Sequence, residues 1–317
     1  MMDYTDRHCR YFLRLLSPSA LLYTEMITAR ALVRGDVARL LNFDAFEQPV
    51  ALQLGGSEPE ELAIAAKLGE QWGYREINLN CGCPSDRVKS GQFGACLMGD
   101  SARVRDCVAA MQSEVAIPVT IKCRIGIEPG MNNMDDETFL RGFIAKVSDS
   151  GCRTFVIHAR RAVLTGLSPK ENREIPPLRY DVAARMRSAF PDLAIIVNGG
   201  IRTCDEVARH LEHFAGVMIG REAYQNPYLL ALLHQQLHPE AGLPDRAQVL
   251  LAYAQYMADQ CAQGERPQSM VRHVLGLYNG LPGARSWRRF LSENASRTGV
   301  SPHLLEESLR IVQSQAA

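Results

Sequence analysis

The sequence lacks any run of roughly eighteen apolar residues, the length at which a helix can span a membrane. Its first twenty residues contain several charges, so the apolar stretch of a signal peptide is also missing. No low-complexity segment is present, and the hydrophobic share of 46% and charged share of 22% are ordinary for globular proteins. We therefore expect a folded protein with neither a membrane span nor a signal peptide.

An excess of charge of one sign is also absent, since 35 basic residues balance 35 acidic ones. This argues against a generally polycationic nucleic-acid-binding protein, although a local basic patch can still bind a phosphate backbone. The nine cysteines are irregularly spaced and include no Cys-x-x-Cys pair. This pattern argues against a disulfide framework and favours the reducing cytoplasm as the location of the protein.

Short apolar stretches alternate with longer stretches of helical periodicity, such as residues 58–72 and 101–114, as far as residue 220. Such alternation is typical of a parallel sheet that is covered by helices on its outer face. Seven stretches are predicted to be strands: residues 21–27, 50–54, 76–80, 119–124, 154–158, 194–198 and 216–220.

A chain of 317 residues is long enough for one α/β barrel, which takes about 250 residues, and a smaller second domain. Seven strands are one fewer than a barrel requires, and a helix capped by Thr5 or Asp6 precedes the first of them. We expect a TIM (β/α)8 barrel over residues 1–227, with its first strand missing or encoded upstream of Met1. An open seven-stranded sheet is the alternative.

After Tyr224 the alternation stops, and an all-helical domain is predicted over residues 228–317. Between residues 265 and 297, six arginines outnumber two glutamates, and three of the arginines lie on one face of a helix beside Trp287. In an otherwise neutral protein this face is either solvated or binds an RNA backbone. The predicted helices are residues 228–237, 246–263, 269–279, 283–297 and 302–313, and the three arginines are Arg285, Arg288 and Arg289.

Polar or glycine residues end most of the predicted strands, and the carboxyl ends of barrel strands form the active-site face. A doubled glycine and a Gly-Arg pair at the last two ends are typical of a phosphate site. Lys122 interrupts an apolar strand, which favours an anionic cofactor ring as its partner over a carboxylate. His158 is either a core histidine or, beside Arg160 and Arg161, part of an anion site. The strand-end residues are Gln53, Asn80, Cys83, Lys122, Arg124, His158, Arg160, Asn198, Gly199, Gly200, Gly220 and Arg221.

Cys83 lies in the segment Asn-Cys-Gly-Cys-Pro-Ser at residues 80–85, directly after a predicted strand. Three roles are open to its thiol: a buried structural group, a metal ligand together with Cys81 and Cys96, or a proton donor. A free thiol with a pKa of about 8.5 is mostly protonated at neutral pH, which favours the proton donor. The glycine-spaced residues 86–98 are predicted to form a binding loop, and residues 166–177 are too long and charged for a minimal turn.

The same segment, followed by Gly91 and the pair Gly94-Ala95, resembles the signature of the tRNA-dihydrouridine synthases. The start of the chain, Met1 to Asp6, is similar to the amino-terminal motif of that family without its Ala-Pro. Residues 166–178 and 272–294 resemble the bacterial A subfamily, which modifies uridines 20 and 20a of the tRNA D-loop. The resemblance covers essentially the whole chain. It implies an FMN-binding TIM barrel that is followed by a helical tRNA-binding domain.

The resemblance further implies that NADPH reduces FMN, that the flavin passes hydride to C6 of uridine, and that Cys83 protonates C5. It implies that tRNA is the macromolecular partner, with no metal and no membrane partner, and we expect a monomer in the cytoplasm. The FMN-binding residues that it implies are Met1, Met2, Gln53, Lys122, His158, Asn198, Gly199, Gly200, Gly220 and Arg221. The tRNA-binding residues that it implies are Asn80, Lys170, Arg173, Arg285 and Arg288.

Two other functions remain as alternatives. One is a barrel flavoenzyme that reduces a small pyrimidine, similar to the dihydroorotate dehydrogenases; such an enzyme has no need of a helical domain with an arginine face. The other is a truncated protein that binds tRNA without catalysis. A flavin absorbance spectrum and activity on free uridine compared with folded tRNA separate the three functions.

Overall fold

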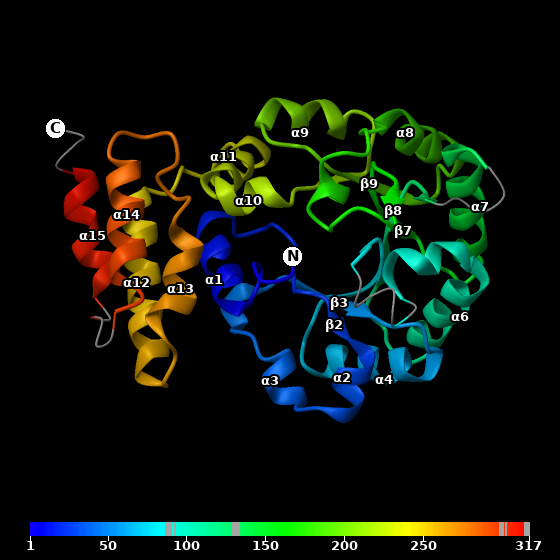
Figure 1. The fold of residues 1–317 in the computed structure, drawn as a ribbon, viewed down its shortest axis with the longest axis horizontal. Helices are drawn as coiled ribbons and strands as arrows, with labels where there is room; N and C mark the ends of the chain where they lie inside the picture. The colour runs from blue at the N-terminus through cyan, green and yellow to red at the C-terminus, as the bar shows by residue number, and fades with distance from the viewer. Residues whose placement is uncertain (86–90, 92, 129–133, 298–300, 302, 314–317) are drawn as a thin grey trace. The chain divides into compact units, whose positions relative to one another are not determined.

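The computed structural model of the chain describes residues 1–85, 91, 93–128, 134–297, 301 and 303–313 (Figure 1). By their internal contacts the residues divide into two compact units, which are considered separately below. Unit 1 comprises Met1–Leu22, Phe43–Gln48 and Arg221–Ala317, and unit 2 comprises Tyr23–Asn42 and Pro49–Gly220.

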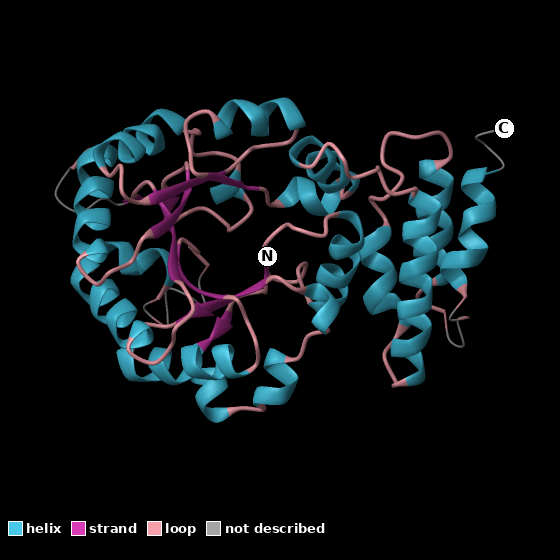
Figure 2. Ribbon diagram, turned by 180° about the vertical axis from the view of Figure 1, so that it is seen from behind, coloured by secondary structure: helices cyan, strands magenta, loops and turns pink. Residues whose placement is uncertain are grey.

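Unit 2 is built around a curved sheet whose paired strands are parallel, with helices on its outer side (Figure 2). The order along the sheet is β1-β3-β4-β5-β7-β9-β10, with β2 paired to β3. The strands are almost wholly buried, as expected for a parallel sheet with covered faces. Their bounds are β1 Leu22–Tyr23, β2 Ile27–Thr28, β3 Val50–Gly55, β4 Glu76–Cys81, β5 Val119–Arg124, β7 Thr154–His158, β9 Ala194–Asn198 and β10 Gly216–Met218.

The predicted α/β barrel architecture with a helical C-terminal region is therefore confirmed, and β5, β7 and β9 have the predicted bounds. The first predicted strand, residues 21–27, is instead split into β1 and β2. Thr24 still donates its N–H to Ala51 O at 3.0 Å, but the next N–H of β3, that of Gln53, donates to the Thr24 hydroxyl at 3.0 Å instead of to a backbone carbonyl, which interrupts the ladder. The expectation of a strand encoded upstream of Met1 stays a prediction.

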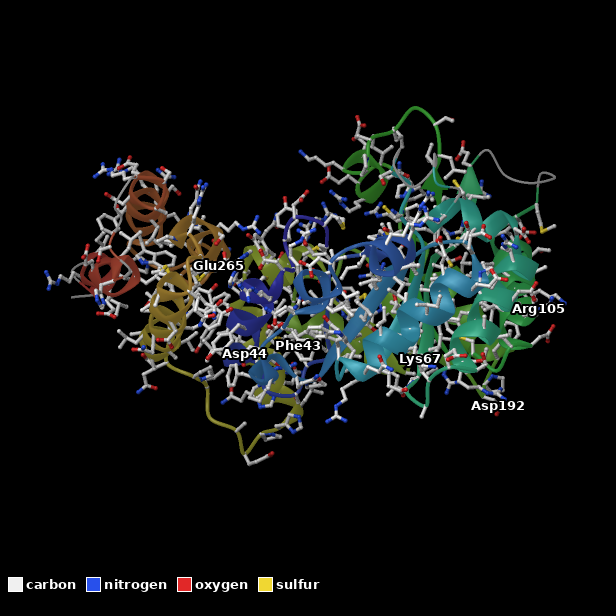
Figure 3. The ribbon with its side chains drawn as sticks, turned by 90° about the horizontal axis from the view of Figure 1, so that it is seen from below. Phe43, Asp44, Lys67, Arg105, Asp192 and Glu265 are labelled. Carbon is white, nitrogen blue, oxygen red and sulfur yellow. The ribbon has the colours of Figure 1, made fainter. Side chains whose placement is uncertain are left out.

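Most of the helices described in unit 2 begin at side chains that cap their free N–H groups, whereas α4 and α8 have no such cap. Asp100 accepts from Arg103 N at 2.9 Å to start α6, and Thr203 and Glu206 form a capping box at the start of α9. In Figure 3 the charged side chains of Lys67 on α4 and Arg105 on α6 point away from the sheet. The bounds are α2 Ala29–Arg34, α3 Val37–Leu41, α4 Pro59–Gln71, α6 Ser101–Gln112, α7 Asp136–Ser148, α8 Tyr180–Ala189 and α9 Cys204–Leu211.

A small second sheet of two residues in each strand joins β6 (Ile127–Glu128) to β8 (Ala162–Val163). Both strands follow directly on barrel strands, β6 after β5 and β8 after β7. They were not predicted, because two residues are too few to show an alternating pattern.

Unit 1 is helical within the described residues, and its first helix, α1 (Arg7–Leu16), contacts α11, α12 and α13. The predicted N-cap is confirmed, since Asp6 Oδ1 accepts from Cys9 N at 2.9 Å. The five predicted C-terminal helices are all present, the last of them from Leu304, and α11 has its predicted bounds. The bounds are η1 Ala45–Glu47, α10 Arg221–Gln225, α11 Tyr228–Leu237, α12 Arg246–Ala262, α13 Pro267–Val274, α14 Ala284–Asn294 and α15 Leu304–Gln313.

The division by contacts differs from the predicted functional domains, residues 1–227 and 228–317, because α1 clusters with the C-terminal helices. A functional boundary is not defined by contacts, so these domains stay a prediction. Among the described residues, no helix combines the length and the apolar character that are needed to cross a bilayer.

Candidate functional site

One face of the unit 2 sheet presents polar side chains toward its inner side. Leu52 and Ile77 point outward and pack against Gly69 of the α4 helix. Their methyl groups lie 2.6 and 2.7 Å from the position that a Cβ on Gly69 would take. Residues that alternate with them, such as Gln53 and Asn78, therefore point inward. Gln53 is in register with Asn78, Asn78 with Thr120, and Asn80 with Lys122. The sheet thus aligns these polar side chains in two adjacent layers.

Cys83 lies in a tight turn directly after β4, and its residue is half-buried. Asn80 Oδ1 accepts the N–H groups of Gly82 and Cys83, both at 3.0 Å. The Cys83 carbonyl accepts from Ala95 N at 2.9 Å, and its Sγ donates to Ser85 Oγ at 3.5 Å. The turn thus fixes the backbone of Cys83 on both sides while leaving its thiol partly accessible.

The neighbouring Cys81 is fully buried, and burial raises the pKa of its thiol well above the ordinary value. It is therefore an inert core thiol, in contrast to half-buried Cys83 and Cys96. Within the described ranges, no group of three or more His, Cys, Asp or Glu side chains is arranged to hold a metal ion. Residues 86–90 and 92 of the predicted binding loop lie outside the described residues.

Lys122 is half-buried near the carboxyl end of β5. Burial, followed by the charge of Arg124, lowers the pKa of its ammonium group from 10.5 to about 8. A lysine in this environment gains from an anionic ligand, which would restore the stability of its charged form. The anionic cofactor ring that the sequence favours as the partner of Lys122 stays a prediction.

Arg124, which is 3% exposed, connects the turn before Cys83 with the loop of residues 166–177. Its Nε donates to Gly82 O at 3.1 Å, and its Nη1 donates to Asn172 O at 3.0 Å and Arg161 O at 3.1 Å. The guanidinium group of Arg124 thus donates to protein carbonyls, which indicates a structural role for this residue.

The same loop is held from within by Asn172, which is fully buried. Its side chain donates to Val163 O at 2.9 Å and accepts from Val163 N at 2.7 Å. Lys170 is exposed beside it and Arg173 is half-buried, both at the short helix η3 (Glu171–Arg173). The structure therefore places these two predicted tRNA-binding residues on a braced surface loop.

The turn after β9 requires its two glycines. Gly199 and Gly200 have φ values of +119° and +71°, and the φ of Gly200 lies in the left-handed region. A Cβ on Gly199 would lie 2.7 Å from His158 Cδ2, and one on Gly200 would lie 2.6 Å from Leu178 Cδ1. His158 and Asn198 are in register at this level, and each is 9% exposed. The two glycines therefore let the turn pack directly against His158 and Leu178, which side chains at these positions would prevent.

Several of the predicted cationic groups already have protein partners. Arg161 forms an ion pair with Asp136. Arg160 donates to the carbonyls of Glu174 and Pro176. The expectation that these two arginines support anion binding by His158 is therefore not favoured by their contacts. Gly220 ends unit 2, while Arg221 begins α10 in unit 1.

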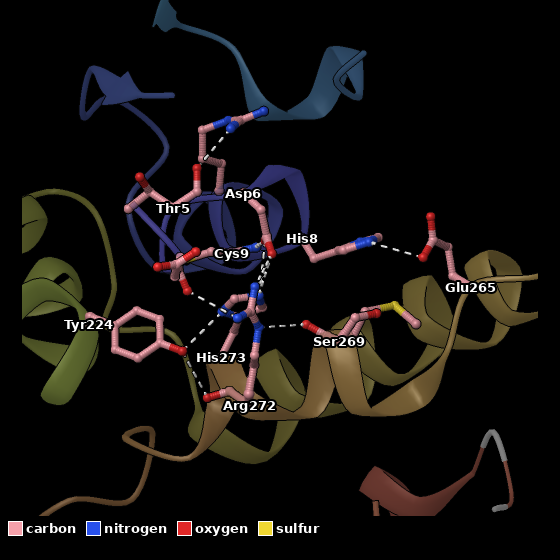
Figure 4. A network of polar contacts seen from close by, with 12 residues as sticks. Thr5, Asp6, His8, Cys9, Tyr224, Glu265, Ser269, Arg272 and His273 are labelled. Atoms are coloured by element: carbon pink, nitrogen blue, oxygen red, sulfur yellow. Dashed lines mark hydrogen bonds and ion pairs between the residues drawn. The ribbon is translucent and has the colours of Figure 1, made fainter. Parts of the chain in front are cut away.

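The amino-terminal segment with Met1 and Met2 is anchored inside unit 1 by a network that centres on Asp6 (Figure 4). Arg272 donates to Asp3 O at 3.0 Å and pairs with Asp6 at 2.5 Å, and His273 Nε2 lies 2.9 Å from Asp6 Oδ1. Burial raises the pKa of the Asp6 carboxyl, but His273, the Cys9 N–H and Arg272 together lower it below its usual value. Helix α13 thus fixes the segment that precedes α1.

Helix α14 presents Arg285 and Arg289 as exposed residues and Arg288 as a half-buried one. Arg288 Nη1 reaches Asn279 Oδ1 at 3.4 Å. Trp287 points to the opposite side, is 0% exposed, and donates its indole N–H to Ser308 Oγ at 2.9 Å. The arginine face therefore exists as predicted, whereas Trp287 is a core residue that is not available to a ligand.

Comparison with known sequences gives one consistent result. A sequence model described as "Dihydrouridine synthase (Dus)" matches residues 1–315. A tRNA-dihydrouridine(20/20a) synthase of Xanthomonas campestris pv. campestris is 52% identical over 318 residues, which cover 100% of this chain and 93% of that protein. Proteins with the same name from Vibrio cholerae serotype O1 and Escherichia coli O6:H1 are 53% and 52% identical, over 99% and 98% of this chain and 95% and 93% of their own.

Proposed function

Since the chain belongs to the dihydrouridine synthase family, we propose that it reduces the C5–C6 double bond of uridine in tRNA to give dihydrouridine. The names of its relatives support positions 20 and 20a as the targets. The observation that favours a catalytic protein over a mere tRNA binder is the Cys83 turn, because a partly accessible thiol is held at a strand end by two backbone bonds.

The residues present fit FMN as the cofactor. The Gly199-Gly200 turn, which has no room for side chains, is the proposed phosphate site, and Lys122, whose pKa is lowered to about 8, gains from an anion. When bound and reduced by NADPH, FMN supplies the hydride that C6 of uridine takes up. The residues proposed to hold it are Met1, Met2, Gln53, Lys122, His158, Asn198, Gly199, Gly200, Gly220 and Arg221.

Cys83 is the proposed general acid. Its Sγ lies 3.5 Å from Ser85 Oγ, within reach of a neutral hydroxyl rather than of a charged group. Transfer of that proton to C5, together with hydride addition at C6, converts the C5–C6 double bond to a single bond, and the thiolate then takes a proton back from solvent.

Lys170 and Arg173 on the braced loop, Arg285 and Arg288 on α14, and Asn80 are the proposed tRNA contacts. The four cationic side chains are exposed or half-buried, as contacts to phosphate require. On this proposal residues 1–227 bind the flavin, residues 228–317 bind tRNA, and the protein acts as a monomer in the cytoplasm.

The direct test uses the purified chain. We expect a flavin absorbance spectrum, oxidation of NADPH that depends on tRNA, and dihydrouridine in the product tRNA by nucleoside mass spectrometry. Free uridine serves as the control substrate and should not be reduced. A flavin-loaded protein that reduces free uridine as well as folded tRNA would favour a small-pyrimidine reductase, and a flavin-free protein that binds tRNA would favour a non-catalytic binder.

A further inference from the structure

A continuous chain of side-chain hydrogen bonds crosses the inner side of unit 2, from the amino end of β4 to the turn that holds Cys83. Thr120 Oγ1 donates to Glu76 Oε1 at 2.7 Å, and Asn78 Nδ2 donates to Thr120 Oγ1 at 2.8 Å. Gln53 Nε2 then donates to Asn78 Oδ1 at 2.9 Å, and Asn80 Nδ2 donates to Gln53 Oε1 at 2.8 Å. We call these five residues the amide chain.

The donor and acceptor of every bond in the amide chain follow from the end at Asn80. The N–H groups of Gly82 and Cys83 can only donate, so Asn80 must turn its oxygen toward them and its amide nitrogen toward Gln53. Gln53 therefore accepts through its oxygen and donates through its nitrogen, and Asn78 does the same. The Thr120 hydroxyl then accepts from Asn78 and donates to Glu76. Burial raises the pKa of the Glu76 carboxyl, but its Oε1 accepts from both Thr120 and Tyr23, so this oxygen ends the chain as an acceptor.

The middle of the amide chain is closed to solvent, since Asn78 is 0% and Thr120 1% exposed. A broken link there leaves a buried donor or acceptor without a partner, and water cannot readily replace it. The orientation of Asn80 and the acceptor at Glu76 are therefore linked through bonds that solvent cannot replace. Tyr23 is a side branch: its hydroxyl donates to the same Glu76 oxygen at 2.7 Å, and it is not needed to reach Asn80.

We propose that Glu76, Thr120 and Asn78 are positioning residues, which act through Gln53 and Asn80 to hold the Cys83 turn in the geometry for proton donation. The inference rests on the proposed function of Cys83 for its catalytic consequence. The structural alternative is that the chain merely satisfies the hydrogen-bonding groups of the barrel interior, with no effect on the turn.

The first experiment compares three variants at saturating FMN. Thr120→Val removes the hydroxyl with little change of shape, Thr120→Ser retains it, and Tyr23→Phe removes the side branch alone. For Thr120→Val we expect kcat for dihydrouridine formation to fall by about 10- to 100-fold, with KM for tRNA and flavin reduction by NADPH little changed. Thr120→Ser and Tyr23→Phe should remain near the wild-type rate. An unchanged kcat in folded Thr120→Val would overturn the inference, as would an effect confined to FMN affinity.

A second measurement needs no activity. Hydrogen exchange of a peptide that spans residues 80–85 reports the Gly82 and Cys83 N–H groups, which donate to Asn80. We expect about tenfold faster exchange in Thr120→Val than in Tyr23→Phe, and equal rates would contradict the proposal. Should the valine variant not fold, Asn78→Leu removes the next link and is tested in the same way. If the wild-type protein makes no dihydrouridine while Thr120→Val still exchanges faster than Tyr23→Phe, the proposed function is refuted and the role of the amide chain in holding the turn is supported.

Discussion

Cys83 is the residue on which the proposed chemistry depends most. We expect Cys83→Ala to retain FMN and its reduction by NADPH, but to lose dihydrouridine formation by a factor of about 10²–10⁴, the usual contribution of a general acid. Single-turnover reduction of tRNA by the pre-reduced enzyme measures this step. Cys96→Ala is the matched control, since Cys96 is also half-buried and should be dispensable. A normal rate in the Cys83 variant together with a slow Cys96 variant would transfer the acid role to Cys96.

Lys122 makes the stability of the flavin-free protein depend on pH. Its pKa of about 8 in the folded protein lies below 10.5, so the unfolded chain binds more protons between these values and stability rises with pH. Between pH 7.5 and 9.5 the gain is on the order of 1–2 kcal/mol. Urea unfolding measures this contribution as the difference in stability between the wild type and Lys122→Met, because buried cysteines such as Cys81, whose thiol pKa is raised, lower the stability of both proteins over the same range. A difference that stays constant between pH 7.5 and 9.5 would show that Lys122 does not titrate there.

At this scale the sequence predicts which residues lie at strand ends, but not how they are bonded. The alternation of Glu76, Asn78 and Asn80 is visible in the sequence, yet it gives no sign that these side chains join Gln53 and Thr120 in one chain. That link depends on the register between β3, β4 and β5, which only the folded sheet defines. Likewise, Trp287 beside three arginines resembles part of a surface, and only the packing of α14 on α15 shows that it is buried.

Among the elements, α14 is expected to bind the tRNA backbone through its arginine face. Each of Arg285→Ala and Arg288→Ala should weaken tRNA binding and reduce the slope of log K against log salt by about one, with FMN content unchanged. Arg105→Ala on α6 is the control, because Arg105 is paired with Asp106 at 2.6 Å on the outer layer of unit 2. Wild-type slopes in both α14 variants would restore the view that this face is merely solvated.

The start of α1 depends on the charge of Asp6 as well as on its capping bond. Asparagine caps a helix about as well as aspartate, so Asp6→Asn isolates the contacts with Arg272 and His273. We expect a loss of about 1–3 kcal/mol at pH 7 in urea unfolding. Because the pKa of Asp6 is lowered in the folded protein, this difference should shrink as the pH falls below 3.8.

Asp36→Asn, at the exposed N-cap of α3, is the matched control and should cost little. An equal loss in the two variants would mean that the ion pairs at Asp6 do not contribute to stability.

For most elements the sequence suffices, because strands such as residues 119–124 are apolar runs bounded by clear turns. It fails where the deciding contact is distant in sequence. The first strand is interrupted where the Thr24 hydroxyl accepts the N–H of Gln53, and β6 and β8 pair only because two strand ends meet. The clustering of α1 with α11, α12 and α13 is likewise a property of tertiary packing, which the local pattern of α1 does not contain.

For the whole molecule, the central claim is that this chain forms dihydrouridine in tRNA with Cys83 as the acid. The most direct measurement is mass spectrometry of tRNA from a bacterial strain that lacks its own tRNA-dihydrouridine(20/20a) synthase and expresses this chain. We predict that the wild-type chain restores dihydrouridine at positions 20 and 20a, and that Cys83→Ala, expressed at the same level, does not. Unmodified uridine at both positions with the wild-type chain, or full modification with the alanine variant, would contradict the claim.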